Sequence, residues 1–145
     1  MEHLAWKKWF EVGHDTIDFE HKTFFSLINK ANDFVKEGRE SEEIRRVFDE
    51  LLKYADFHLT SEENVMVECD YPYLEEHRGE HRRLMIKLRE DITSFEGEAM
   101  EASKIVHFLF EWLLNHTITE DLNISAAVKQ KNLKGYFTML EEGDA

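Results

Sequence analysis

Apolar residues recur every three to four positions along most of the chain, the spacing that places them on one face of an α-helix. Four such blocks predict four helices, over about residues 17–37, 41–66, 72–95 and 98–116. Gly38 follows the first block as a C-terminal cap, and Ser41 is a residue type that favours a helix start. The links between the blocks are short, so neighbouring helices should run antiparallel. The pattern predicts an all-α fold, an up-down-up-down four-helix bundle.

The two ends of the chain fall outside this pattern. The residues before Ile17 predict an N-terminal arm, with Trp6 and Trp9 packed on the bundle. The residues from about Leu122 to the C-terminus predict a short C-terminal helix or a tail, and such a helix would be interrupted at Gly135 and followed by an acidic tail. We take the 145 residues as a single domain, 1–145, because they match the size of one compact unit.

Composition narrows the class of protein. The chain has 18 Lys and Arg against 31 Asp and Glu, a formal net charge of −13. This balance argues against a nucleic-acid partner and against binding to an anionic membrane surface. No stretch reaches the ~20 apolar residues that a membrane span needs. With one cysteine and no recognisable signal peptide, the expected localisation is cytoplasmic.

Each predicted helix carries ionisable residues on its apolar face. An unpaired carboxylate or imidazole is costly to bury. One such residue would be an ordinary hydrogen-bonded core residue, but seven of them across the bundle need a common partner. These seven are His21, His58, Glu62, His77, His81, His116 and Asp121.

The positions of these residues along their helices predict one shared site. They lie near the start of the first and third helices and near the end of the second and fourth, which is the same end of an up-down-up-down bundle. His58 with Glu62, and His77 with His81, are four residues apart and so share a face. Asp121 follows His116 by five residues, a spacing that requires a π-type bulge or a helix end.

The chemistry of the seven side chains points to two metal ions. Five imidazoles and two carboxylates exceed the four ligands that a structural zinc takes. Mixed nitrogen and oxygen donors suit iron, and carboxylates can bridge two ions. We therefore expect two iron ions with coordination sites left for a small ligand.

Four motifs then resemble those of the bacteriohaemerythrins, a family of di-iron O2-binding proteins, over about residues 6–121. The motifs are I-D-F-E-H at Ile17–His21, H-L-T-S-E-E at His58–Glu63, H-R-G-E-H at His77–His81 and W-L-L-N-H-T-I-T-E-D at Trp112–Asp121. The resemblance implies one iron held by His77, His81 and His116, and an O2-binding iron held by His21 and His58. It also implies that Glu62 and Asp121 bridge the two irons.

The same resemblance implies an O2 pocket walled by Trp112 and Leu113, with Leu59 and Thr117 at two further positions. Leu59 and Thr117 depart from the phenylalanine and isoleucine that are common there. Ile124 similarly replaces a frequent tyrosine. The Thr117 hydroxyl either donates into the pocket, which would shorten the life of bound O2, or bonds back to the carbonyl of Leu113.

The expected function is reversible binding of O2 for storage, delivery or sensing, without enzymatic turnover. The alternative is a di-iron oxidase, peroxidase or nitric-oxide-handling enzyme. Di-iron oxidases of the ferritin-like class use Glu-x-x-His pairs and are rich in carboxylates. The histidine-rich set of this chain favours binding.

Overall fold

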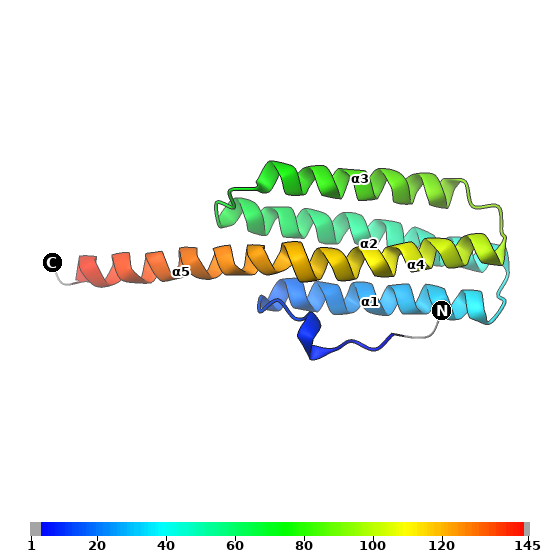
Figure 1. Ribbon diagram of the computed structural model, residues 1–145, viewed down its shortest axis with the longest axis horizontal. Coiled ribbons are helices and arrows are strands. Elements are labelled where there is room, and N and C mark those ends of the chain that lie inside the picture. The colour runs from blue at the N-terminus through cyan, green and yellow to red at the C-terminus, as the bar shows by residue number, and fades with distance from the viewer. Residues whose placement is uncertain (1–3, 144–145) are drawn as a thin grey trace.

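The computed structural model describes residues 4–143, without the side chains at 118, 136 and 137 (Figure 1). Over this range every regular element is helical: a short 3-10 turn Lys8–Phe10, α1 Asp15–Lys36, α2 Ser41–Glu68, α3 Leu74–Thr93, α4 Ala99–His116, the π-helical segment η2 Thr117–Asp121, and α5 Leu122–Gly143. Helix α1 packs against α2 and α4, and α3 packs against the same two helices. The predicted up-down-up-down four-helix bundle is confirmed.

The helix ends follow the local chemistry of the sequence. Gly38 has a φ of 67°, and its N–H donates to the carbonyl of Val35, which closes the C-terminus of α1 as predicted. Helix α3 begins at Leu74, two residues after the predicted start. Pro72 disfavours helical backbone at the residue before it and lies instead in the turn that leads into α3.

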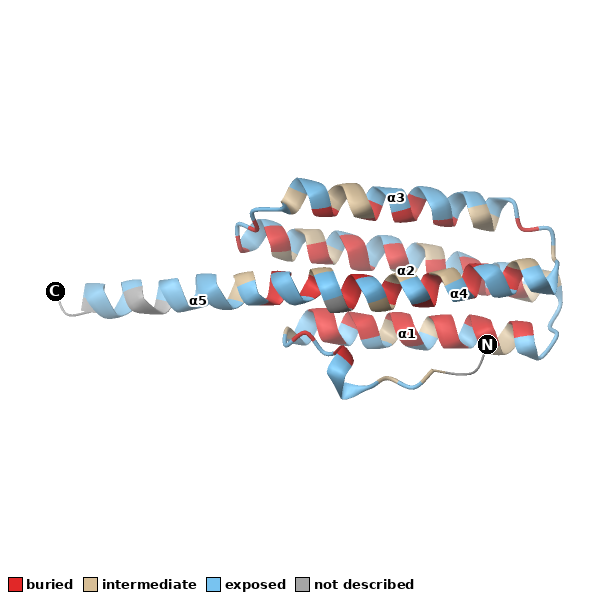
Figure 2. Cartoon of the chain, in the orientation of Figure 1, coloured by how far each residue is buried: buried red, intermediate tan, exposed pale blue. Residues whose placement is uncertain are grey.

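The core follows the predicted apolar faces, and Figure 2 shows the buried residues along the inner sides of α1, α2 and α4. A second, smaller cluster closes the end of the bundle where α4 passes into α5. Its buried members are Val12, Ile17, Met66, Cys69, Tyr71 and Ile124. Burial of apolar surface at this end keeps water from the polar residues beside it.

The N-terminal arm is fastened to α1 by one carboxylate and one indole. Asp18 accepts hydrogen bonds from the N–H groups of Val12 and Gly13, at 2.8 and 3.1 Å. The Trp6 ring packs edge-on against Phe25, with 5.7 Å between centroids, as predicted. The prediction for Trp9 was wrong, because its side chain lies on the solvent side of the arm and is 64% exposed.

The C-terminal segment departs from its prediction. Helix α5 has 22 residues and continues the line of α4 through the π-helical segment, so that the chain ends in a rod that extends beyond the bundle (Figure 1). Gly135 does not interrupt it. A glycine in a helix costs about 1 kcal/mol, which is too little to break the helix when the residues on both sides of the glycine favour helical backbone. Between residues 4 and 143, no helix is long and apolar enough to cross a membrane.

Candidate metal centre

The seven predicted ligand residues converge inside one end of the bundle. His21 comes from α1, His58 and Glu62 from α2, His77 and His81 from α3, His116 from the end of α4, and Asp121 from the π-helical segment. All seven are buried, with at most 4% of any residue exposed. The structure thus brings together all seven residues that the sequence predicted as ligands.

The side chains form two groups that share one member. His77, His81 and His116 surround one oxygen of Glu62, and His21, His58 and Asp121 form a second group with the same residue. Within each group, the possible ligand atoms all lie within 4.8 Å of one another. Three histidines belong to the first group and two to the second.

The carboxylate of Glu62 faces both groups. Its Oε1 atom lies 2.8, 3.1 and 3.0 Å from the Nε2 atoms of His77, His81 and His116. Its Oε2 atom lies 3.4 Å from Nε2 of His58 and 3.8 Å from Nε2 of His21.

Asp121 divides its two oxygens in the same way. Its Oδ2 atom lies 2.8 Å from Nε2 of His21, whereas Oδ1 lies 3.0 Å from Nε2 of His116 and 3.6 Å from Nε2 of His77. Each carboxylate therefore presents one oxygen to the three-histidine group and the other to the two-histidine group. This is the arrangement that two bridging carboxylates need between two cations.

Hydrogen bonding among the described residues leaves several of these inward-facing atoms without a partner. Among the described residues, no hydrogen bond of good geometry reaches Nε2 of His21 or His58, Oε2 of Glu62, or either carboxylate oxygen of Asp121. Buried polar atoms normally have hydrogen-bond partners. Nitrogen and oxygen atoms that lack partners and surround a common centre are therefore better explained as metal ligands than as members of a hydrogen-bonded core. Imidazole nitrogens with carboxylate oxygens are a donor set that suits iron.

Residues 12–128 match the protein family described as "Hemerythrin HHE cation binding domain". The chain belongs to this family. A bacteriohaemerythrin of Pseudomonas aeruginosa is 28% identical over 129 residues, which cover 89% of this chain and 84% of that protein. A haemerythrin subunit alpha of Lingula anatina is 30% identical over 123 residues, covering 83% and 91%. The crystal structure of a haemerythrin point mutant superimposes with a TM-score of 0.76 at 26% identity, covering 88% of this chain and 98% of that one.

The protonation of this haemerythrin-family cluster is set by its mutual charges. Burial alone would lower the pKa of His58, but the nearby carboxylates of Glu20 and Glu62 outweigh burial and raise that pKa to about 9. Burial would likewise raise the pKa of Asp121, as would the neighbouring Glu62, but His116 and His21 hold it at about 2. In the metal-free protein, the opposite charges of the cluster therefore favour the protonated form of His58 and the ionised form of Asp121.

Two further carboxylates lie directly outside the histidines of the haemerythrin site. Nδ1–H of His58 donates to Glu20 at 2.8 Å, and Glu20 also accepts from the Ser61 hydroxyl at 2.7 Å. Nδ1–H of His81 donates to Glu63 at 2.9 Å. In both rings the proton on Nδ1 leaves the lone pair of Nε2 directed into the site.

Glu20 and Glu63 belong to two of the sequence motifs, but the sequence predicted no role for either residue. Each is adjacent to a predicted ligand, His21 or Glu62, and therefore points roughly 100° away from it around the helix. A general rule of metal sites could have indicated these two carboxylates, because metal-bound imidazoles commonly donate their second N–H to a carboxylate.

The predicted pocket residues differ in their surroundings. Leu59 and Leu113 are buried, at 2% and 1% exposure, and Trp112 is half-buried with its ring stacked on His116, 4.3 Å between centroids. The Thr117 hydroxyl is buried and has no hydrogen-bond partner among the described residues. The alternative in which it bonds back to the carbonyl of Leu113 is therefore not what the structure has.

Proposed function

We propose that this chain binds two iron ions and uses them to bind O2 reversibly, as a storage, delivery or sensing protein. The observation that carries the proposal is the orientation of Glu62 and Asp121, each with one oxygen toward either histidine group. Membership of the haemerythrin family supports iron as the metal and O2 as the ligand.

The geometry supports a specific assignment of ligands. His77, His81 and His116 would hold one iron, His21 and His58 the other, and Glu62 and Asp121 would bridge them. When bound, the iron pair supplies the electrons for reversible O2 binding. The two-histidine group offers fewer protein ligands, so its iron would be the one that binds O2.

The surrounding side chains would control water and protons. Leu59 and Leu113 place apolar surface in the interior around the histidines, which limits access of water to the site. Trp112 covers one face of the His116 ring and fixes its orientation. Thr117 brings a hydroxyl with no partner among the described residues into this buried region, and this hydroxyl can donate a hydrogen bond.

Binding fits the donor set better than substrate oxidation. In the described part of the core, the paired ligands are His58 with Glu62 and His77 with His81, both four residues apart. Ferritin-like oxidases rely on Glu-x-x-His pairs and more carboxylates. The donor set therefore favours O2 binding over the activity of a di-iron oxidase, peroxidase or nitric-oxide-handling enzyme.

The test is iron content together with an optical spectrum. Protein loaded with Fe(II) under anaerobic conditions should contain two irons per chain. Addition of O2 should produce a visible absorption band that disappears when O2 is removed. One metal per chain, or irreversible oxidation with turnover of an added reductant, would overturn the proposal in favour of a different metal site or an enzyme.

A further inference from the structure

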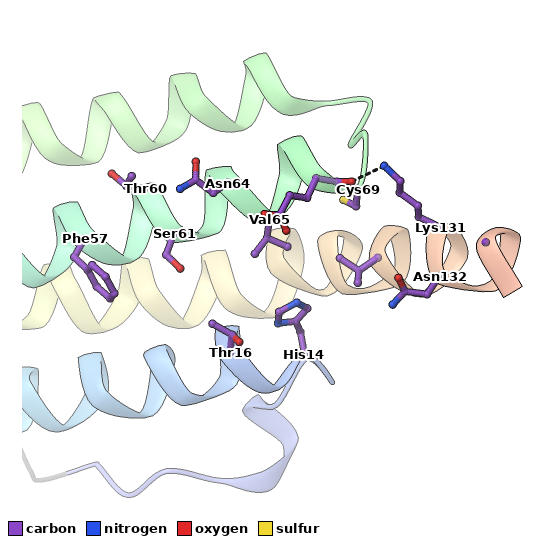
Figure 3. A pocket seen from close by; sticks show the side chains of 13 residues that line it. His14, Thr16, Phe57, Thr60, Ser61, Asn64, Val65, Cys69, Lys131 and Asn132 are labelled. Carbon is purple, nitrogen blue, oxygen red and sulfur yellow. Dashed lines mark hydrogen bonds between the residues drawn. The ribbon is translucent and has the colours of Figure 1, made fainter.

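A groove separates the start of α1 from the first half of α5. It has a volume of about 300 Å³, and its two sides contribute Gly13 and Thr16 on one and Ser125, Lys129 and Asn132 on the other. It adjoins a larger hollow of about 920 Å³ between α1, α2 and α5, where Figure 3 shows Thr16 at the start of α1 and Asn132 on α5. None of the seven candidate metal ligands lines the groove, so it is a separate feature of the molecule.

Ser125 is a buried polar residue on the α5 side of this groove. Only 2% of the residue is exposed, and its hydroxyl has no hydrogen-bond partner among the described residues. The hydroxyl lies 3.7 Å from the position that a Cβ atom of Gly13 would take, so it faces the start of α1. Buried hydroxyls normally have a partner, and in a helix the carbonyl four residues earlier often supplies it. An unpartnered hydroxyl that lines a groove therefore points to a ligand.

The ammonium group of Lys129 lies beside Gly13 on the same side. Gly13 has a φ of 88°, and a Cβ atom there would come within 2.9 Å of Nζ of Lys129. Glycine therefore provides both the left-handed backbone and the room that the ammonium group occupies. No carboxylate of the described chain forms an ion pair with Lys129, so its positive charge is available to a ligand.

The start of α1 adds backbone donors to the groove. The first N–H groups of a helix have no acceptor within the helix. In α1, the N–H of Ile17 donates to Nδ1 of His14, and the N–H of Asp18 donates to the carbonyl of His14. This leaves the N–H groups of Asp15 and Thr16 for a ligand. The positive end of the dipole of this 22-residue helix also attracts negative charge.

We propose that this groove binds a small oxyanion, either inorganic phosphate or a phosphomonoester, between the start of α1 and α5. The ligand accepts hydrogen bonds from the start of α1 and from Ser125, and it pairs with the ammonium group of Lys129. The side-chain amide of Asn132 and the hydroxyl of Thr16 are two further donors on its rim. Such a ligand would tie α5 to α1, beside the existing ion pair of Lys131 with Asp70. The proposal goes beyond the iron site and does not depend on it.

The test is calorimetric titration of the full chain, both loaded with iron and metal-free, at an ionic strength held constant with chloride. Inorganic phosphate and glycerol phosphate are the two probes, and the tighter binder identifies the ligand as the free ion or the monoester. One anion should bind per chain. Lys129→Gln should weaken binding about tenfold, because a charged donor is lost. Lys134→Gln should leave it unchanged, since Lys134 lies on the same helix outside the groove.

Ser125→Ala separates a binding role from a structural one. Removal of a buried hydroxyl that has no partner should not lower the melting temperature of the phosphate-free protein. It should weaken phosphate binding about three- to tenfold, and so reduce the rise in melting temperature that phosphate produces. Asp15→Asn should have the opposite effect and tighten binding, because Asp15 is exposed and brings a carboxylate to the lining.

Three results would overturn the site. The first is a wild-type chain that shows no saturable binding of either probe. The second is equal affinity in wild type, Lys129→Gln and Ser125→Ala, which would place the anion elsewhere on the chain. The third is binding to the iron-loaded protein alone, with a change in the optical spectrum, which would place the anion on the metals. Iron content, measured in the same samples, reports separately on the metal centre.

Discussion

Asp121 follows His116 by five residues, yet its Oδ1 atom lies 3.0 Å from Nε2 of His116. In a regular α-helix, residues at that separation point about 140° apart. The π-helical segment Thr117–Asp121 widens the turn and returns Asp121 to the face of His116. Oδ2 of Asp121 then reaches His21 at 2.8 Å, so an irregularity in one helix links the two histidine groups.

Asp121→Ala should reduce the iron content to at most one per chain, because it removes a carboxylate that faces both groups. Asn123→Ala is the control, since Asn123 is exposed two residues further along and its side chain donates to the carbonyl of Thr119. Elemental analysis after anaerobic loading with Fe(II) measures the result. Retention of two tightly bound irons in the Asp121 variant would contradict a bridging role.

His21→Ala should separate the two iron positions. His21 belongs only to the two-histidine group, so the variant should keep about one iron and lose O2 binding. His107→Ala should change neither quantity, because His107 lies on the surface with its side chain 59% exposed and paired with Glu111. If the His21 variant binds two irons and O2 normally, the assignment of the O2-binding position is wrong.

The metal-free protein should lose stability as the pH rises above neutral. The folded-state pKa of His58 is about 9, above the unfolded value of 6.5, so its contribution is complete below pH 6.5 and lost as the pH passes 9. For this one histidine the contribution is on the order of 3 kcal/mol. Asp121, with a folded pKa of about 2, adds stability above pH 3.8 that is lost toward pH 2.

Thermal melts of metal-free protein from pH 2 to 10 should therefore show greatest stability between about pH 4 and 6.5. Iron needs deprotonated imidazoles, so its binding near pH 7 should release protons, measurable by calorimetry in buffers of different ionisation enthalpy. A melting temperature that rises steadily from pH 6.5 to 9 in the absence of metal would refute the ion-paired cluster.

Glu20→Gln and Glu63→Gln should weaken iron binding by about 10- to 100-fold, since each removes a carboxylate that orients a histidine and strengthens it as a donor. Loss of the negative charge should also raise the reduction potential of the iron pair, an effect that a purely structural role would not produce. Glu68→Gln, at an exposed position of α2, is the control. Equal potentials in all three variants would exclude tuning by these carboxylates.

Thr117→Val should lengthen the lifetime of the O2-bound protein. Valine keeps the branched shape but removes a buried hydroxyl that has no partner among the described residues and can donate a proton to bound O2. Thr119→Val is the control, because the Thr119 hydroxyl is exposed and donates to the carbonyl of Asn115 at 2.6 Å. Decay of the O2-dependent absorption band measures the lifetime. Equal decay in wild type and Thr117→Val would remove Thr117 from the chemistry.

Local pattern was enough to predict the four helices and the set of residues that meet at the centre. Side-chain direction repeats regularly along a helix, so the spacing of His58 and Glu62 placed both on one face before any packing was known. Apolar periodicity and short links then fixed which ends of the helices adjoin. The spacing of His116 and Asp121 excluded a regular helix but left a π-type bulge and a helix end as alternatives, and the structure has the π-helical segment.

Only the tertiary structure decided the contacts between side chains of different helices. Three features of the site depend on interhelical distances of a few ångströms. They are the direction of each oxygen of Glu62 and Asp121, the pairing of Glu20 with His58, and the Thr117 hydroxyl without a partner in the described chain. Those distances come from how side chains interdigitate over the whole core. The length of α5 was also undecided by sequence, because the small local penalty of Gly135 had to be weighed against the helix on both sides.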